Sequence, residues 1–310
     1  MMTLVRSLVS ITAVGGLAVH VWWWFHRRRR PNLPIPSVAS PPLAAAATAL
    51  TGRVFIVTGG ARGVGEGVAL ALAARGAAGI TIVDRDAPAS GRVQRILEAE
   101  PYCCRTLVVC ADLSKAEECK RVIKEHDAAF QRVDGLVNCA ATTARGSWQA
   151  TSPKLFDMIM ALNVRAPFML MQGVSELIER DDTEARGGSI VNIGSIHTHG
   201  GMPKLVAYAA SKAALLAITK NFAFAKRHHR IRANYIALGW TATPTEHETM
   251  LAEGQPSDWL SRVADPSHPF GRIYRPADVG HLVAYLMSDA AKMQTGTCID
   301  LHEGFFGTWE

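Results

Sequence analysis

A glycine-rich turn between a predicted strand and a predicted helix is the feature that most constrains the fold of this chain. The strand is the apolar run 53–58, whose continuous hydrophobicity is typical of a parallel strand buried on both faces. A helical pattern of apolar residues begins at Val68. Glycines permit a tight turn, and the N-terminus of the following helix offers N–H groups to a phosphate. The turn residues expected to contact a dinucleotide are Gly59, Arg62, Gly63, Val64 and Gly65.

A second apolar run, 80–83, ends in Asp84, which lies 19 residues beyond Gly65. An acidic residue ~20 residues beyond such a turn binds the ribose hydroxyls of a dinucleotide, and its charge would repel a 2′-phosphate. Asp84 therefore favours NAD(H) as the cofactor. Arg62 and Arg85 are cations that could attract a 2′-phosphate, so NADP(H) remains an alternative.

Strand-like and helix-like runs alternate through the rest of the chain, with further strands expected at 106–110, 135–137 and 189–193. Such alternation requires right-handed crossovers and a parallel sheet that helices cover on both faces. The predicted fold class is therefore α/β, with one Rossmann-type doubly wound parallel sheet in a single domain over residues 51–310. Ligands of such sheets bind at the carboxyl ends of the strands, where these motifs fall.

Three residues with the chemistry of a proton-transfer site follow in order. Ser195 comes after the predicted strand 189–193, and Tyr208 and Lys212 open a helical run. Positions four apart share a helix face, so Tyr208 and Lys212 should point the same way. A free tyrosine has a pKa of ~10, which a nearby ammonium lowers. Tyr208 can then exchange a proton with an alcohol while a hydride moves to or from nicotinamide, and Ser195 can hold the same oxygen.

Together, the glycine turn, the segment 138–141, Ser195 and the Tyr208-x-x-x-Lys212 pair resemble the short-chain dehydrogenase/reductase family over residues 51–310. The resemblance implies an enzyme that interconverts an alcohol and a carbonyl with NAD or NADP and assembles as a homodimer or homotetramer. It also implies a role for Asn163 in a water-mediated proton relay, and a last strand at 295–300. The cofactor contacts that it implies are Asp112, Leu113, Asn138, Tyr208, Lys212, Gly239, Thr241 and Thr243.

The substrate is predicted less directly. Trp148, His197 and Trp240 lie near predicted strand ends and are candidate pocket residues. The loop 239–244 resembles family members that act on polyols or sugar derivatives, and the polar character of residues 244–270 agrees with that class. An NADP(H)-dependent reductase of a lipid, steroid or retinoid is the alternative. A non-catalytic dinucleotide-binding protein is a second alternative, which has no need of Ser195, Tyr208 and Lys212 together.

The N-terminus reads as a targeting segment. Residues 8–25 form an apolar run without formal charge that ends in a tryptophan cluster, and Arg27 to Arg30 follow it. A bilayer span needs ~20 apolar residues, and tryptophans suit the membrane interface. Residues 1–30 are therefore predicted to be a membrane anchor, followed by a Pro/Ala-rich linker at 31–50. The positive-inside rule places the catalytic domain in the cytoplasm. A mitochondrial presequence is the alternative, because the first 65 residues contain no acid.

The formal net charge of +6 comes mainly from this N-terminal part. The first 50 residues contain five arginines and no Lys, Asp or Glu, which leaves 28 basic and 27 acidic residues in the body. A body this close to neutral argues against nucleic-acid binding, which needs a basic face, so a small-molecule partner is expected. The six cysteines form no CxxC pair, and no Cys/His cluster has zinc spacing, so no metal is predicted.

Overall fold

A computed structural model describes residues 49–180, 186–200, 202–263 and 270–302. The predicted anchor at 1–30 lies outside the described residues, as does the predicted linker except for residues 49 and 50. Among the helices that are described, none is both long enough and apolar enough to cross a membrane.

A seven-stranded sheet with parallel pairing throughout forms the centre of the described fold, in the order β3-β2-β1-β4-β5-β6-β7. The sheet confirms the predicted Rossmann-type fold class. Its order reverses direction at β1, next to β4, which is where ligands of doubly wound sheets bind. The strands are β1 (Val54–Thr58), β2 (Gly79–Asp84), β3 (Arg105–Cys110), β4 (Gly135–Asn138), β5 (Gly188–Ile193), β6 (Ile231–Leu238) and β7 (Cys298–Leu301).

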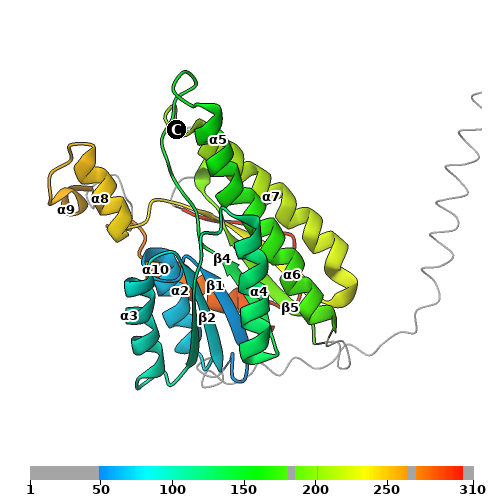
Figure 1. The fold of residues 1–310 in the computed structure, drawn as a ribbon. Coiled ribbons are helices and arrows are strands. Elements are labelled where there is room, and N and C mark those ends of the chain that lie inside the picture. The colour runs from blue at the N-terminus through cyan, green and yellow to red at the C-terminus, as the bar shows by residue number, and fades with distance from the viewer. Residues whose placement is uncertain (1–48, 181–185, 201, 264–269, 303–310) are drawn as a thin grey trace, which may run out of the picture. The chain divides into compact units, whose positions relative to one another are not determined.

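Helices cover both faces of the sheet (Figure 1). On one face lie α2 (Gly63–Ala73), α3 (Ala87–Glu98) and α10 (Pro276–Met287), and on the other lie α4 (Ala116–Phe130), α6 (Ala166–Arg180) and α7 (Val206–Lys226). A hydrophobic core lies on each face of the sheet, and alternate residues of β1 point into one or the other. Phe55 and Val57 pack toward α2, whereas Ile56 packs toward α6. A strand buried on both faces must be apolar at every position, which explains the continuous run that the sequence shows.

The shorter elements follow the carboxyl ends of the strands. After β4 come α5 (Pro153–Met160) and the π-helical turn η2 (Ala161–Arg165), and after β5 comes η4 (Ile196–His199). After β6 come α8 (Pro244–Ala252) and α9 (Trp259–Val263), which Figure 1 shows projecting beyond the main body of helices. The short 3-10 turns η5 (Arg227–His229) and η6 (Asp289–Ala291) lie elsewhere along the chain. The elements at the carboxyl edge are therefore the ones placed to build a site.

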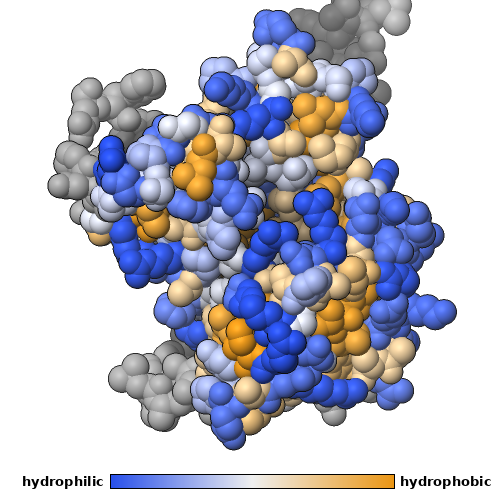
Figure 2. Space-filling model, turned by 60° about the vertical axis from the view of Figure 1, so that its left-hand side comes forward, coloured by the Kyte–Doolittle hydropathy of each residue, from blue (hydrophilic) through white to orange (hydrophobic). Residues whose placement is uncertain are grey.

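Two details differ from the sequence prediction or sharpen it. The last strand begins at Cys298 rather than Thr295, because Gly296 takes a left-handed conformation with φ +71 and donates its N–H to Ala233 O. The helices α2 and α10 touch through glycines: a Cβ on Gly67 would lie 2.6 Å from Pro276 Cβ. Figure 2 shows one face of the molecule as mainly hydrophilic, with apolar residues in separate patches.

Candidate active site

The glycine turn has the geometry of a phosphate-binding turn. Gly59 and Gly63 take positive φ values of +64 and +54, and a Cβ on Gly65 would lie 2.0 Å from Gly59 O. Side chains are therefore excluded at positions 59 and 65 for steric reasons. Among the described side chains none caps the N-terminus of α2, whose first residues include Val64. The N–H groups there are free of side-chain partners in the described part, which suits an anionic group.

Asp84 lies at the carboxyl end of β2 and is tied to the glycine turn. Its Oδ2 accepts a hydrogen bond from Ala61 N at 3.2 Å, and its Oδ1 accepts one from Asp86 N at 3.1 Å. Arg62 pairs with Asp86 at 3.2 Å, so its guanidinium already has a carboxylate partner. The arrangement brings a carboxylate next to the predicted dinucleotide turn.

Two predicted cofactor residues lie beyond β3. Asp112 is exposed, and a hydrogen bond from the Ser114 hydroxyl is the main reason that its pKa is lowered. Leu113 is buried in the core on the α6 side. The structure thus gives Leu113 a packing role and leaves Asp112 ionised at the carboxyl edge of the sheet.

Asn138 and Thr58 connect the ends of three strands. Asn138 Nδ2 donates to Asn192 Oδ1 at 2.8 Å, which bridges β4 and β5, and Asn138 Oδ1 is buried with no hydrogen-bond partner among the described residues. Thr58 Oγ1 accepts the N–H groups of both Cys139 and Ala140 at 3.1 Å. Sequence reasoning did not assign Thr58 a role, although it is the residue immediately before the glycine turn.

The loop after β6 meets the glycine turn. A Cβ built on Gly63 would lie 3.3 Å from Thr243 Cγ2, so Thr243 faces that turn across the carboxyl edge. Thr243 Oγ1 also accepts Glu246 N at 3.1 Å and so caps the N-terminus of α8. Thr241 is buried, and its hydroxyl donates to Gly239 O at 3.1 Å. The predicted cofactor segments 59–65 and 239–243 therefore lie together, and their glycines and free N–H groups fit a dinucleotide.

The four predicted catalytic residues are brought together in a buried cluster. Ser195, Tyr208, Lys212 and Asn163 are each less than one-tenth exposed. The Ser195 side chain hydrogen-bonds Tyr208, and Lys212 Nζ lies 5.7 Å from the centroid of the Tyr208 ring. The predicted common helix face of Tyr208 and Lys212 is confirmed, because both lie on the buried side of α7.

Asn163 is locked in place by the protein. It sits in the π-helical turn η2, and its Nδ2 donates to Thr142 O and to Ser211 Oγ, both at 3.0 Å. Its Oδ1 accepts Thr142 N at 2.9 Å. Asn163 therefore joins the loop after β4 to α7 directly beside Lys212, whereas its role in holding a water stays a prediction.

Burial dominates the electrostatics of the cluster. It raises the pKa of Tyr208, against a smaller lowering by the Ser195 hydrogen bond and together with a further raising by Glu246. Burial also lowers the pKa of Lys212 to about 8. Lys212 Nζ donates to Ile193 O at 2.8 Å rather than to the tyrosine oxygen. The lowered tyrosine pKa expected from a neighbouring ammonium is thus not found, because desolvation raises the pKa of Tyr208 instead.

A second tyrosine, Tyr235 on β6, hydrogen-bonds the backbone of the cluster. Tyr235 OH donates to Lys212 O at 3.1 Å and accepts Ser195 N at 3.2 Å, and it lies 2.5 Å from Thr198 Oγ1. One hydroxyl on β6 therefore fixes the backbone of two predicted catalytic residues on different elements. Sequence reasoning missed Tyr235, since it lies inside an ordinary apolar strand with no motif around it.

The three predicted substrate-facing residues lie in different surroundings. The His197 ring lies edge-on to the Tyr208 ring with centroids 6.3 Å apart, and burial lowers the pKa of His197. Trp240 instead stacks on Trp259 of α9 at 5.4 Å and donates its indole N–H to Glu246 at 2.8 Å. Trp148 is 79% exposed. Of the three, His197 is shown in ring contact with Tyr208, and the substrate assignment of all three stays a prediction.

Comparisons with known proteins agree with this geometry. A family model described as enoyl-(acyl carrier protein) reductase matches residues 58–305. A hydroxynaphthalene reductase-like protein of Metarhizium robertsii is 30% identical over 82% of this chain and 95% of its own, and L-fucose dehydrogenase of Bos taurus is 29% identical over 81% and 88%. The solved structure of L-sorbose reductase from Gluconobacter frateurii, complexed with NADPH and L-sorbose, has a TM-score of 0.77 and 26% identity over 85% of this chain and all of its own.

The family match covers the described sheet from the last residue of β1, Thr58, through β7. It includes the glycine turn, the buried cluster around Tyr208 and the loop after β6. The chain therefore belongs to the short-chain dehydrogenase/reductase family of oxidoreductases, which act on alcohol and carbonyl groups with NAD or NADP.

Proposed function

We propose that this protein interconverts a secondary alcohol and the corresponding carbonyl, with Tyr208 as the group that gives or takes the proton. The observation that carries the proposal is the buried contact of Tyr208 with Ser195, with the Lys212 ammonium beside the tyrosine ring. A purely dinucleotide-binding protein has no use for this cluster, because none of the three is needed to bind a pyrophosphate. The second alternative, a non-catalytic protein, is therefore less well supported.

Ser195, Tyr208 and Lys212 each have a separate role in the proposed reaction. Ser195 and Tyr208 offer two hydroxyl groups to one substrate oxygen, which orients that oxygen. Burial keeps the Tyr208 hydroxyl protonated at neutral pH, which is the state that gives a proton to a carbonyl oxygen. Lys212 keeps a cation next to the ring, and this cation stabilises the negative charge that develops on the tyrosine oxygen as the proton leaves. The cluster can therefore supply the acid for carbonyl reduction, whichever direction the concentrations of substrate and cofactor favour.

A nicotinamide cofactor would lie across the glycine turn and the loop after β6, held by Gly63, Asp84 and Thr243. When bound, it supplies the carbon that donates or accepts the hydride. Asp84 supports NAD(H), because its carboxylate beside the turn disfavours a 2′-phosphate, and because Arg62, one of the two arginines that could attract that phosphate, is paired with Asp86. The NADPH in the structure of the similar L-sorbose reductase instead favours NADP(H), which stays the alternative cofactor.

A polyol or sugar derivative is the proposed substrate class. The helix α8 carries polar residues, and the charge of one of them, Glu246, raises the pKa of Tyr208. Two of the similar proteins are named for sugar substrates, L-fucose and L-sorbose. A lipid, steroid or retinoid carbonyl would fit an enzyme anchored at a membrane, and it is the alternative that a substrate panel should include.

The proposed anchor at residues 8–25 and the proposed assembly as a homodimer or homotetramer rest on the sequence. Carbonate extraction of membranes distinguishes an integral anchor, which stays in the pellet, from a released protein. Import into isolated mitochondria tests the alternative location. Light scattering of the purified chain gives the number of subunits.

The proposed chemistry is tested by turnover of NADH and NADPH with a panel of polyols, sugars, steroids and retinoids, in both directions. Tyr208→Phe keeps the ring and removes the proton, so we expect kcat to fall by about 10²–10⁴-fold. Tyr285→Phe, an exposed tyrosine on α10, is the matched control and should keep full turnover. Wild-type turnover in Tyr208→Phe would exclude the mechanism.

A further inference from the structure

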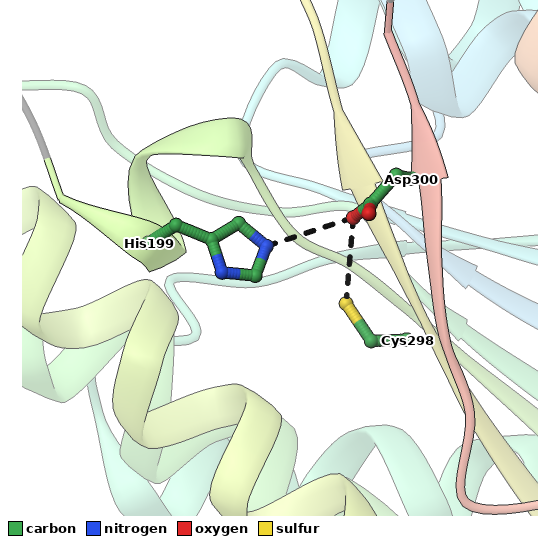
Figure 3. A group of neighbouring side chains, drawn as sticks. All are labelled: His199, Cys298 and Asp300. Carbon is green, nitrogen blue, oxygen red and sulfur yellow. Dashed lines mark hydrogen bonds and ion pairs between the residues drawn. The ribbon is translucent and has the colours of Figure 1, made fainter. Parts of the chain in front are cut away.

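Three potential metal ligands from two distant segments converge beside the edge strand β7. His199 ends the short turn η4, and Cys298 and Asp300 lie two apart on β7 and therefore on the same face of that strand. Figure 3 shows the His199 imidazole and the Cys298 sulfur both directed at the carboxylate of Asp300. His199 Nε2 lies 3.6 Å and Cys298 Sγ lies 3.8 Å from Asp300 Oδ1.

These separations are those of ligands around one small cation. Bonds of ~2.0–2.3 Å from zinc to N, O and S ligands, in a tetrahedron, place the ligand atoms about 3.3–3.8 Å from one another. The three ligand atoms of the cluster all lie within 4.8 Å of one another, so small side-chain rotations complete the fit. A fourth side chain is close, since His302 Nε2 lies 4.0 Å from the same Asp300 oxygen.

We propose that His199, Cys298 and Asp300 bind one Zn²⁺ ion, with water in the fourth position and His302 as a neighbour of the Asp300 carboxylate. The chemistry selects the ion: a thiolate is a soft ligand that Ca²⁺ and Mg²⁺ do not use, whereas imidazole, thiolate and carboxylate together are a zinc set. A thiolate and a carboxylate also bring two negative charges to a divalent cation. Cys298 releases its proton when the metal binds.

The ion would link the loop that carries Ser195 to the last strand of the sheet. Ser195 caps the N-terminus of η4, where its Oγ accepts His197 N at 3.2 Å, and Thr198 Oγ1 lies 2.5 Å from Tyr235 OH. A metal bound at His199 therefore ties the far end of this turn to β7, and with it the segment next to the catalytic cluster. The side chains of His199 and Asp300 are 34% and 53% exposed, which gives an ion access from solvent.

The test is a titration of the chelator-treated full chain with Co²⁺, which takes zinc sites and reports on its ligands. We expect saturation at one Co²⁺ per chain, an intense visible spectrum typical of four-coordinate cobalt, and a thiolate-to-cobalt charge-transfer band in the near ultraviolet. Added Zn²⁺ should displace the Co²⁺ and so remove both the visible spectrum and the charge-transfer band. In Cys298→Ser the charge-transfer band should vanish, and in Asp300→Asn or His199→Gln the affinity should fall at least about tenfold.

Two controls separate this site from adventitious binding. Cys103→Ser removes an exposed thiol outside the cluster, and His228→Gln with His229→Gln removes a surface histidine pair; both should leave the titration unchanged. Circular dichroism without metal establishes that each variant is folded. At one Zn²⁺ concentration that saturates the wild type, the melting temperature of the wild type should rise by about 5 °C and that of Asp300→Asn by less. A titration without saturable binding, or a charge-transfer band that survives in Cys298→Ser, would overturn the proposal.

Discussion

A Cβ atom on Gly194 would lie 1.8 Å from Cζ of Tyr235, so the absence of a side chain at position 194 makes room for the tyrosine ring. The ring in turn delivers its hydroxyl to Ser195 N and Lys212 O. The glycine directly before the catalytic serine is therefore part of the support of the active site. This pair leads to two predictions.

Gly194→Ala should destabilise the fold by about 1–3 kcal/mol, because an extra methyl group in a packed core forces its neighbours aside. The displaced Tyr235 should also lower kcat. Denaturant unfolding and steady-state kinetics measure the two effects. The matched control is Gly91→Ala on α3, where a Cβ meets nothing within 4 Å and should stabilise the helix instead. Equal stabilities of the two variants would contradict the steric argument.

Tyr235→Phe should retain the packing of the ring and lose the three contacts of the hydroxyl. Because Ser195 N and Lys212 O would be left buried without this partner, we expect a loss of about 1–3 kcal/mol in the free energy of unfolding. The effect on kcat should exceed that on KM, since the hydroxyl hydrogen-bonds the backbone of Ser195 and Lys212 and so positions these two predicted catalytic residues. An unchanged kcat with reduced stability would show that Tyr235 acts on the fold alone.

Thr58→Val should weaken cofactor binding, because it destabilises the loop after β4 next to the glycine turn. The hydroxyl of Thr58 is the acceptor for the N–H groups of Cys139 and Ala140, and Gly59 packs against Ala140. Removing that acceptor costs about 1–3 kcal/mol locally, where β1 and β4 carry the cofactor loops. The dissociation constant of NADH, measured by fluorescence, should rise; Thr81→Val, which removes a hydroxyl away from the turn, should leave it unchanged. A NADH affinity equal to that of the wild type would count against this role.

Asp84→Asn should reduce the preference for NAD(H) over NADP(H). The amide keeps an acceptor for Ala61 N but removes the charge that disfavours a 2′-phosphate. We expect the ratio of kcat/KM for NADH and NADPH to shift toward NADPH by about tenfold or more, equivalent to about 1.4 kcal/mol. Asp112→Asn, which lies beyond the next strand, is the control. A ratio that does not move would show that Asp84 does not decide the cofactor.

Acidification should destabilise the fold through His126, which is fully buried. Its Nε2 donates to Arg132 O and its Nδ1 accepts from Thr81, and burial lowers its pKa from 6.5 to about 4, against smaller raising effects of the Arg132 carbonyl, Asp127 and Asp134. The unfolded chain protonates this group first, so stability falls as the pH drops from about 6.5 to about 4, by up to about 3 kcal/mol.

The comparison that isolates His126 is unfolding of the wild type and of His126→Asn at a series of pH values. The variant should be less stable at pH 7, because its side chain cannot reach both partners. The difference between the two proteins should shrink toward pH 4, since only the wild type pays for a buried imidazole that resists protonation. A difference that stays constant over this range would contradict a lowered pKa.

The sequence was sufficient for the parts of this protein that depend on local pattern. The buried run before Gly59, the glycine turn and the alternation that follows lead to a parallel sheet, because continuous apolar strands and right-handed crossovers allow few other folds. The spacing of Tyr208 and Lys212 placed both on one face of α7, because helical geometry repeats over a short distance. The order of the motifs then indicated the family and its chemistry.

The tertiary structure decided what depends on contacts between distant segments. Tyr235 supports Ser195 from another strand, Thr58 holds the loop after β4, and His199 meets Cys298 and Asp300 across the sheet edge. None of these pairs has a fixed spacing in the chain, so periodicity carries no signal for them. Burial also set the direction of the Tyr208 pKa, because desolvation is a property of the surrounding fold and outweighs the neighbouring charge that the sequence made visible.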